Sequence, residues 1–191
     1  MAFNIAILIS GNGSNMLEII KACKDGQINS KVIAVISNNP IAKGIKKAKT
    51  QGIITKIINH NEFDNLKDFE ESLSDYLEKK KINLVCLAGF MKVLSRDFTI
   101  KWNKKILNIH PSLLPSFKGL NTHKRAIEKN VKYTGCTVHF VDESIDSGEI
   151  IDQEIVKILK SDTDISLKKK VLMKEHKLYI KVIKKLEKKF G

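Results

Sequence analysis

The first hundred residues alternate between two hydrophobic patterns. Short apolar runs rich in β-branched residues predict buried strands at 4–10, 31–37, 53–58 and 82–88. Between them, apolar residues recur every three to four positions and predict helices at 16–23, 41–51 and 68–80. Strands that alternate with crossover helices are typical of βαβ units, so we expect a mostly parallel, twisted sheet of the Rossmann-like α/β class, flanked by helices.

The pattern changes after residue 100. A strand is predicted at 105–110, where Pro111 stops it, and a loop with prolines and glycines follows at 112–121. A short helix is expected at 122–130.

The last third of the chain predicts three further elements. Strand patterns at 133–141 and 150–157 are separated by the turn-rich string DESIDSGE, so we expect an antiparallel pair at the C-terminal end of the sheet. The segment 165–190 has helical spacing throughout and predicts an amphipathic terminal helix.

Length and composition favour one domain over residues 1–191. The chain is 42% hydrophobic, which suffices for a sizeable core, and it has no repeat or low-complexity linker. No run reaches the roughly 20 apolar residues that span a bilayer, and the apolar stretch 5–9 ends in a glycine turn instead of a signal-peptide cleavage site. We therefore expect a cytoplasmic protein without a membrane partner.

The cysteines predict no disulfide framework. Cys23, Cys86 and Cys136 are odd in number, lack CxxC spacing and lie within apolar patterns. We expect reduced thiols in the core.

The formal net charge of +13 comes almost wholly from lysine, because Arg96 and Arg125 are the only arginines. Such a charge attracts anions and is compatible with nucleic-acid binding. Lysine is spread along the chain, however, and aromatic residues are few. We expect a solvated surface that steers small anionic substrates, and no nucleic-acid partner.

The string ISGNGSN, at 9–15, lies between the first strand and the first helix. A dinucleotide fingerprint needs a third glycine where Met16 stands, and an acidic residue about 20 positions on, where the chain has serine and asparagines. A P-loop needs a lysine after the glycine, which is also absent.

Two interpretations of this turn stay open. Backbone N–H groups of Gly13, Ser14 and Asn15 at a helix N-terminus form an anion site. Alternatively, Asn15 with Glu18 three residues later is only a helix cap.

The string LNIHPSLLP, at 107–115, carries the clearest chemistry. Side chains alternate along a strand, so Asn108 and His110 project to one side at its carboxyl end. An amide donor beside an imidazole suits oxyanion stabilisation and proton transfer at a carbonyl, although a simple strand-end hydrogen bond would also explain the pair.

A carboxylate near His110 would orient the imidazole and stabilise its charged form. The next long turn offers four candidates, which turn chemistry alone also explains: Asp142, Glu143, Asp146 and Glu149.

Other chemistries have little support. No serine lies in a G-x-S-x-G string. We expect no metal site, because no zinc-ligand spacing relates the other histidines, His60, His123, His139 and His176.

Five strings spread over nearly the whole chain carry a family resemblance: ISGNGSN at 9–15, LAGFMKVLS at 87–95, LNIHPSLLPSFKGLNTH at 107–123, GCTVHFVDESIDSGEII at 135–151 and KEH at 174–176. In this order they resemble the folate-dependent phosphoribosylglycinamide formyltransferases of purine synthesis. The string HPSLLP and the Asn, His and Asp trio are shared with the wider formyltransferase superfamily.

This resemblance implies the formyltransferase fold and transfer of a formyl group from 10-formyltetrahydrofolate to the amine of glycinamide ribonucleotide, without a metal. It implies that Asn108 hydrogen-bonds the formyl oxygen and that His110 acts as a cation or proton donor. Asp146 would hold His110 charged and, through water, help to deprotonate the attacking amine.

The resemblance also implies two substrate regions. In the ribonucleotide-binding half, 1–100, Gly13, Ser14 and Asn15 would bind the phosphate, and Glu175 from the second half would lie by the ribose. In the catalytic and folate-binding half, 101–191, the turn Asp142, Glu143, Ser144, Ile145 and Asp146 would frame the pterin ring together with Met91, Lys92, Val93 and Leu94.

One departure from the family pattern concerns the glutamate tail of the folate. Relatives often carry an arginine in a DSRE-like string for the glutamate tail of the folate, and here Leu66 stands at its place. Lys67 is the substitute that we expect, although a lysine cannot reproduce the bidentate grip of an arginine.

Three alternatives remain. Methionyl-tRNA formyltransferase shares the trio but adds a C-terminal tRNA-binding domain, whereas this chain ends at one helix. Formyltetrahydrofolate deformylase carries an N-terminal regulatory domain, whereas the first strand here starts at Asn4. A non-catalytic RNA-binding module would rest on lysine charge alone. We expect small-molecule substrates and a monomer or weak homodimer.

Overall fold

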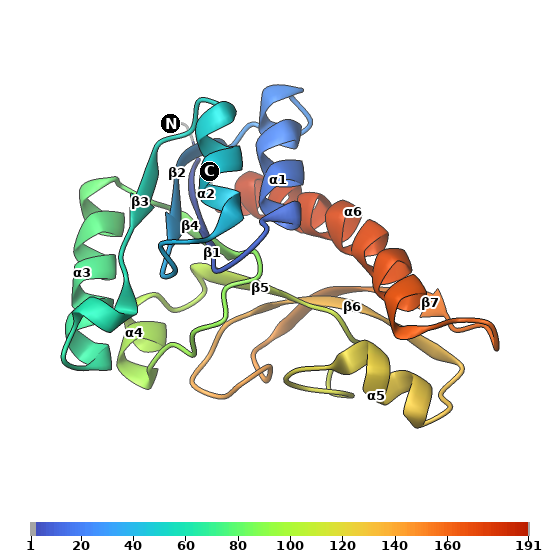
Figure 1. The fold of residues 1–191 in the computed structure, drawn as a ribbon. Coiled ribbons are helices and arrows are strands. Elements are labelled where there is room, and N and C mark those ends of the chain that lie inside the picture. The colour runs from blue at the N-terminus through green and yellow to red at the C-terminus, as the bar shows by residue number, and fades with distance from the viewer. Residues whose placement is uncertain (1–2, 191) are drawn as a thin grey trace.

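The computed structural model describes residues 3–190 and contains a seven-stranded sheet in the order β3-β2-β1-β4-β5-β6-β7 (Figure 1). The pairs among β1 to β5 are parallel, and β6 is antiparallel to both β5 and β7. This confirms the predicted fold class. The strands are β1 Asn4–Ile9, β2 Lys31–Ser37, β3 Thr55–Ile57, β4 Leu84–Leu87, β5 Ile106–His110, β6 Tyr133–Phe140 and β7 Ile150–Lys157.

The helices follow the predicted periodicities except at one place. They are α1 Ser14–Lys24, α2 Lys43–Thr50, α3 Leu66–Lys79, α4 Arg96–Lys101, α5 Thr122–Glu128 and α6 Asp164–Phe190, with a short 3₁₀ turn at His60–Glu62. The sequence pattern did not predict α4, because six residues are too few to establish a helical period. Ser95 precedes this helix as its N-cap, and its side chain accepts a hydrogen bond from the backbone N–H of Phe98.

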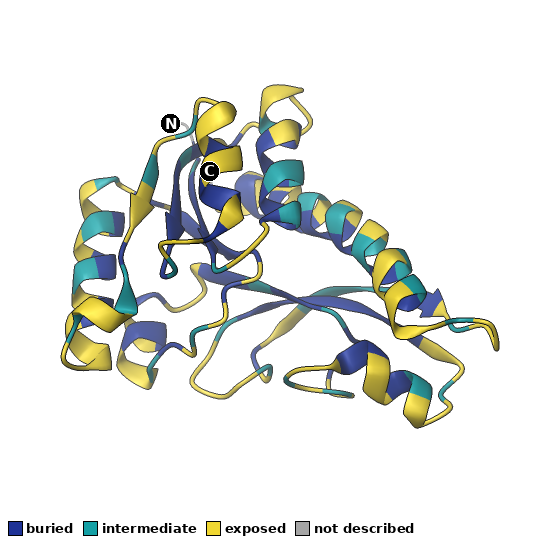
Figure 2. Cartoon of the chain, viewed as in Figure 1, coloured by how far each residue is buried: buried dark blue, intermediate teal, exposed yellow. Residues whose placement is uncertain are grey.

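Two hydrophobic layers cover the sheet. On one face, Ile5, Ile7 and Ile9 of β1 pack with residues of α1, α2 and α6. On the other face, Ala6 and Leu8 pack with residues of α3 and α4. The inner strands are buried from both sides, as Figure 2 shows, which explains why the strands of the parallel half are continuous apolar runs.

The strand order reverses direction between β1 and β4, so the loops after these strands diverge at the carboxyl edge of the sheet. Such a switch point is where ligands of open α/β sheets bind. Ser10 connects the neighbouring loops here. Its backbone N–H donates to the carbonyl of Gly89 over 2.9 Å, and its hydroxyl donates to Oδ1 of Asn38 over 2.6 Å.

The three cysteines are free thiols, as predicted. Cys86 and Cys136 are buried, whereas Cys23 is only partly buried. Burial raises the pKa of Cys23 to about 11 and that of Cys136 to about 12. These thiols are therefore protonated and unreactive at neutral pH.

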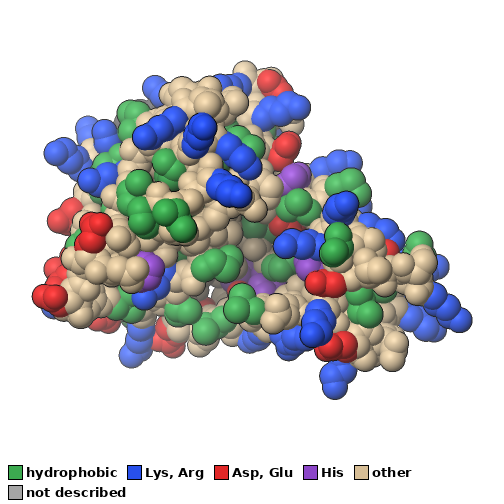
Figure 3. All heavy atoms as spheres, in the orientation of Figure 1, with side chains coloured by type: hydrophobic (Ala, Val, Ile, Leu, Met, Phe, Trp, Pro, Cys, Tyr) green, Lys and Arg blue, Asp and Glu red, His purple; other side chains and the backbone are tan. Residues whose placement is uncertain are grey.

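Lysine and arginine side chains are spread over the face shown in Figure 3 and do not gather in a single patch. Acidic side chains lie between them. Within residues 3–190, no helix is both long enough and apolar enough to cross a membrane.

Candidate active site

Four polar side chains meet beside the carboxyl end of β5, and we call them the β5 cluster: Asn108, His110, His139 and Asp146. Asn108 and His110 lie two residues apart on β5. The antiparallel register pairs Asn108 with His139 of β6. The turn between β6 and β7 then brings Asp146 back to both imidazoles.

His110 has an acceptor at each ring nitrogen. Nδ1 lies 3.2 Å from Oδ2 of Asp146, and Nε2 lies 3.0 Å from the carbonyl oxygen of Phe117. The His110 and Asp146 side chains are only 6% and 11% exposed, so water screens the pair little. Only the doubly protonated imidazolium could donate to both acceptors at once.

Among the four carboxylates of the turn, Asp146 is the one that reaches His110. Its Oδ2 also accepts from the backbone N–H of Gly119 over 2.8 Å. The φ angle of Asp146 is 50°, a left-handed conformation that Asp and Asn tolerate better than most residues. Glu143 and Glu149 instead pair with Arg96 and Lys104 at the surface.

The amide nitrogen of Asn108 lies 3.2 Å from Nε2 of His139. Nδ1 of His139 lies 2.8 Å from the carbonyl oxygen of Phe140. Burial lowers the pKa of His139 below its usual 6.5, more strongly than the nearby carboxylates raise it. His139 is therefore neutral at physiological pH.

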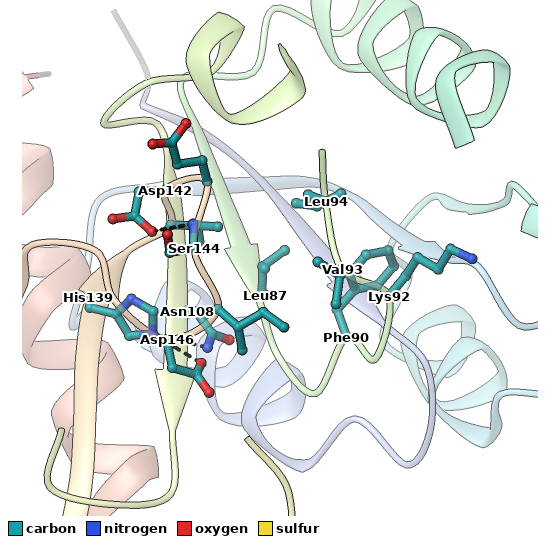
Figure 4. Close-up of a pocket in the computed structure, with 13 residues that line it drawn as sticks. Leu87, Phe90, Lys92, Val93, Leu94, Asn108, His139, Asp142, Ser144 and Asp146 are labelled. Atoms are coloured by element: carbon teal, nitrogen blue, oxygen red, sulfur yellow. Dashed lines mark hydrogen bonds and ion pairs between the residues drawn. The ribbon is translucent and has the colours of Figure 1, made fainter. Parts of the chain in front are cut away.

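A cavity of about 120 Å³ opens beside the cluster (Figure 4), and we call it the β5 cavity. Leu87, Phe90, Val93 and Leu94 supply apolar wall on one side, and Asn108, His139 and Asp146 lie opposite. Eight of the side chains predicted for the folate line it: Lys92, Val93, Leu94, Asp142, Glu143, Ser144, Ile145 and Asp146.

Met91 and Lys67 do not line the β5 cavity. Met91 is 66% exposed, and its backbone N–H donates to the hydroxyl of Ser10. Lys67 lines a separate cavity between α3 and α4, and its Nζ lies 3.8 Å from a carboxylate oxygen of Glu71. Leu66 and Lys92 share a third cavity of about 390 Å³, so Lys92 is the cation that borders both it and the β5 cavity.

The glycine loop, residues 11–15, leads from β1 into α1. Gly13 precedes the helix with a φ of 68°, and no side chain caps the helix N-terminus. The helix-cap interpretation of Asn15 and Glu18 is therefore wrong. Nδ2 of Asn15 instead donates to Oε2 of Glu175 on α6 over 2.7 Å.

Asn15 and Glu175 form a buried pair with spare hydrogen-bonding capacity. Oδ1 of Asn15 is buried and has no hydrogen-bond partner. Burial raises the pKa of Glu175 above its usual 4.5. One helical turn later, the hydroxyl of Tyr179 donates to the carbonyl oxygens of Leu87 and Leu107, which fixes α6 against the carboxyl edge of the sheet.

Four residues of the site were not predicted: His139 and the cavity residues Leu87, Phe90 and Val141. His139 was considered only as a metal ligand. The antiparallel register of β5 and β6 decides its position opposite Asn108. The alternation of side chains within the string TVHF was the sequence feature that could have predicted which face of β6 carries His139. Within residues 3–190, no group of three His, Cys, Asp or Glu side chains is arranged to hold a metal ion.

Comparison with known sequences shows which family the chain belongs to. The formyl transferase family matches residues 3–183. The chain belongs to this family. It is 42% identical over 180 residues to the phosphoribosylglycinamide formyltransferase of Haemophilus influenzae, covering 94% of this chain and 85% of that protein. It is 47% identical over 175 residues to the human trifunctional purine biosynthetic protein adenosine-3, covering 92% of this chain and 17% of that protein.

Solved structures of this formyl transferase family share the fold. The phosphoribosylglycinamide formyltransferase of Coxiella burnetii, in complex with CHES, is 40% identical and superposes with a TM-score of 0.93, covering 96% of this chain and 86% of that one. The Brucella melitensis enzyme is 39% identical with the same TM-score, covering 97% and 96%. The predicted family and transferase class are thus confirmed.

Proposed function

We propose that this chain transfers the formyl group of 10-formyltetrahydrofolate to the amine of glycinamide ribonucleotide, a step of purine biosynthesis. The observation that carries the proposal is the β5 cluster, in which an amide donor, a doubly paired imidazole and a buried carboxylate lie together. The names of the bacterial relatives and the folate-derived formyl donor typical of the family support the choice of substrates.

Attack of an amine on a formyl carbon builds negative charge on the formyl oxygen and positive charge on the nitrogen. Asn108 lines the β5 cavity and would donate a hydrogen bond to that oxygen. Protonated His110 would also stabilise the negative charge on the formyl oxygen, and it would donate a proton to the folate nitrogen as its bond to the formyl carbon breaks. For His110 to act on substrate, Nε2 must exchange the Phe117 carbonyl for the reacting groups.

Asp146 serves this scheme in two ways. Its Oδ2 lies 3.2 Å from Nδ1 and would stabilise the imidazolium of His110. Its second oxygen, Oδ1, lies 3.8 Å from Nε2 of His139 and is free to hold a water molecule that accepts the amine proton. Both steps use Asp146, which the backbone N–H of Gly119 already holds in place, and neither needs a covalent intermediate on the enzyme.

The β5 cavity fits the donor by its chemistry. Leu87, Phe90 and Leu94 form an apolar wall against which the flat pterin ring of the donor would pack. Backbone and side-chain groups of the turn 142–146 would bind the polar edge of that ring. The donor supplies the formyl carbon. The glutamate tail would run past Lys92 toward the third cavity, where Leu66 offers no charge.

The glycine loop would hold the phosphate of the ribonucleotide. N–H groups in the first turn of α1, at Ser14 and Asn15, lack intrahelical partners and suit a dianion. Glu175 would accept from the ribose hydroxyls while Asn15 holds its other oxygen. We also propose that the protein acts in the cytoplasm on small molecules alone, as a monomer or weak homodimer.

A direct assay tests this function. Purified protein is mixed with 10-formyltetrahydrofolate and either glycinamide ribonucleotide or charged initiator tRNA, and loss of the formyl group from the folate is followed. We expect turnover with the ribonucleotide only. Turnover with tRNA only would indicate the methionyl-tRNA reaction, and turnover without an acceptor would indicate a deformylase. Salt-sensitive RNA binding with no turnover would support the binding-module alternative.

A further inference from the structure

His139 is the one member of the β5 cluster to which the proposed mechanism gives no role, although it lies at the centre of the cluster. It is 2% exposed, and Figure 4 shows its ring beside both Asn108 and Asp146. A buried imidazole must satisfy both nitrogens, and each nitrogen has one neighbour within hydrogen-bond distance.

The neighbours of the ring determine where its proton lies. Nδ1 is 2.8 Å from the carbonyl oxygen of Phe140, and a carbonyl oxygen only accepts. Nδ1 therefore carries the hydrogen. In a neutral imidazole Nε2 then has a lone pair, so the group 3.2 Å away on Asn108 must be a donor.

The protonation of His139 thus decides which way the amide of Asn108 points. With neutral His139, the NH₂ group faces Nε2, and its second hydrogen remains free to donate toward the β5 cavity. With a protonated Nε2, the amide would have to turn its oxygen to the ring, and an oxygen would then face the formyl oxygen. The amide of Asn108 would then repel the formyl oxygen instead of donating a hydrogen bond to it.

The surroundings keep the ring neutral. Burial is the largest influence on the pKa of His139 and lowers it. The hydrogen bond with the Phe140 carbonyl and the charges of Asp146 and Asp142 raise the pKa, and His110 lowers it. Oδ1 of Asp146 is 3.8 Å from Nε2, too far for a hydrogen bond, so it does not compete with Asn108. Burial therefore has the largest effect on the pKa of His139. Asp146 pairs instead with His110, whose Nδ1 lies 3.2 Å from Oδ2 of Asp146.

We propose that His139 is the positioning residue of the site, a neutral imidazole whose Nε2 fixes the amide of Asn108 as an oxyanion donor. This role rests on the proposed formyl transfer. The two histidines of the cluster thus have different partners: His110 lies between two acceptors, and His139 lies between one acceptor and one donor.

The tautomer of His139 tests the proposal without any substrate. Long-range ¹H–¹⁵N spectra of protein labelled with ¹⁵N-histidine distinguish the two neutral tautomers and the imidazolium, and the signals of His139 are those missing from His139→Gln. We expect the Nδ1-protonated neutral form at neutral pH. An Nε2-protonated or doubly protonated ring would overturn the proposal. Because this readout needs no turnover, it remains valid if the proposed reaction fails.

Kinetics then test whether His139 acts through Asn108. His139→Leu removes the acceptor, and we expect kcat to fall by about tenfold or more, up to the roughly hundredfold typical for loss of one oxyanion donor. The thermal shift given by glycinamide ribonucleotide should not change. His139→Gln keeps an acceptor on a side chain of similar reach, and should retain more of the kcat than the leucine variant. Equal losses in both variants would count against the acceptor role.

A double-mutant cycle separates positioning from a structural effect. If His139 works only through the amide, His139→Leu should cause no further loss of kcat in an Asn108→Ala background. A loss by the same factor in both backgrounds would show that His139 acts independently of Asn108, and would overturn the proposal.

Discussion

The β5 cluster and the glycine loop lie at the same carboxyl edge of the sheet, but they satisfy their polar atoms in different ways. In the cluster, both nitrogens of His110 and Oδ2 of Asp146 have partners within the protein. In the loop, Oδ1 of Asn15 is buried without a partner, and the first turn of α1 has no side-chain cap.

This difference fits two tasks. Groups that stabilise a transition state must be oriented before the substrate binds, so hydrogen bonds within the protein already hold them in place. A binding loop gains affinity by leaving donors and acceptors for the ligand to satisfy. The comparison predicts that changes in the cluster lower kcat and that changes in the loop weaken binding of the ribonucleotide.

The largest effect is expected from Asp146→Asn. Asparagine keeps the size and tolerates the left-handed backbone, but it removes the charge that pairs with His110. We expect kcat to fall on the order of a hundredfold or more. The thermal shift given by the ribonucleotide should stay largely intact, as measured by differential scanning fluorimetry. Near-normal turnover would contradict the role of Asp146.

Gly13→Ala should affect binding instead. A Cβ at Gly13 would lie 2.9 Å from Cε of Met16, and the φ of 68° disfavours any side chain. Gly26→Ala is the matched control, because its φ is 70° and a Cβ would meet nothing within 4 Å.

Both alanine variants should lose about 1–2 kcal/mol of unfolding free energy to backbone strain. Only Gly13→Ala should also weaken ribonucleotide binding, by about tenfold, or ~1.4 kcal/mol. Isothermal titration calorimetry measures the difference. Equal affinities in the two variants would argue against phosphate binding at the loop.

Glu175→Gln should stabilise the free protein while weakening ribose binding. Burial raises the pKa of the folded carboxyl above its unfolded value, so its contribution to stability is full at low pH and is lost as pH rises through the folded pKa. The neutral amide avoids this loss and still accepts from Asn15. The Tm of the variant should therefore exceed that of the parent by more at about pH 8 than at about pH 5. A constant difference would contradict the raised pKa.

The smallest effect is expected from Lys47→Ala. Nζ of Lys47 donates to the carbonyl oxygen of Asn12 over 3.1 Å, an exposed contact that supports the loop from α2. Exposed contacts of this kind contribute little, so ribonucleotide affinity should fall about two- to threefold. Lys46→Ala, also exposed on α2, should leave the affinity unchanged. An equal loss in both variants would indicate general electrostatic attraction instead of support for the loop.

Much of the fold could be predicted, because hydrophobic periodicity is a local signal. The runs at 31–37 and 150–157 match β2 and β7 residue for residue, and the terminal helix starts within one residue of its predicted position. Helix α4 could not be predicted in this way. Six residues give less than two turns, and its start depends on a single cap at Ser95.

The site was only partly predictable, for a related reason. Strand alternation alone places Asn108 and His110 on one side of β5. From the residues alone, four carboxylates of the turn at 142–149 were equivalent candidates, and which one reaches His110 depends on the path of that turn. The family resemblance singled out Asp146, and the structure places it there.

The sequence by itself determined the α/β class, the glycine loop and the pair on β5, since each depends on residues close together in the chain. Only the tertiary structure decided that Asn15 pairs with Glu175, 160 residues away, and that His139 faces Asn108. Such contacts depend on strand register and on the docking of α6, and no local pattern encodes them. The physical reason is that hydrophobic period fixes which face of an element is buried, but not which polar groups meet at its end.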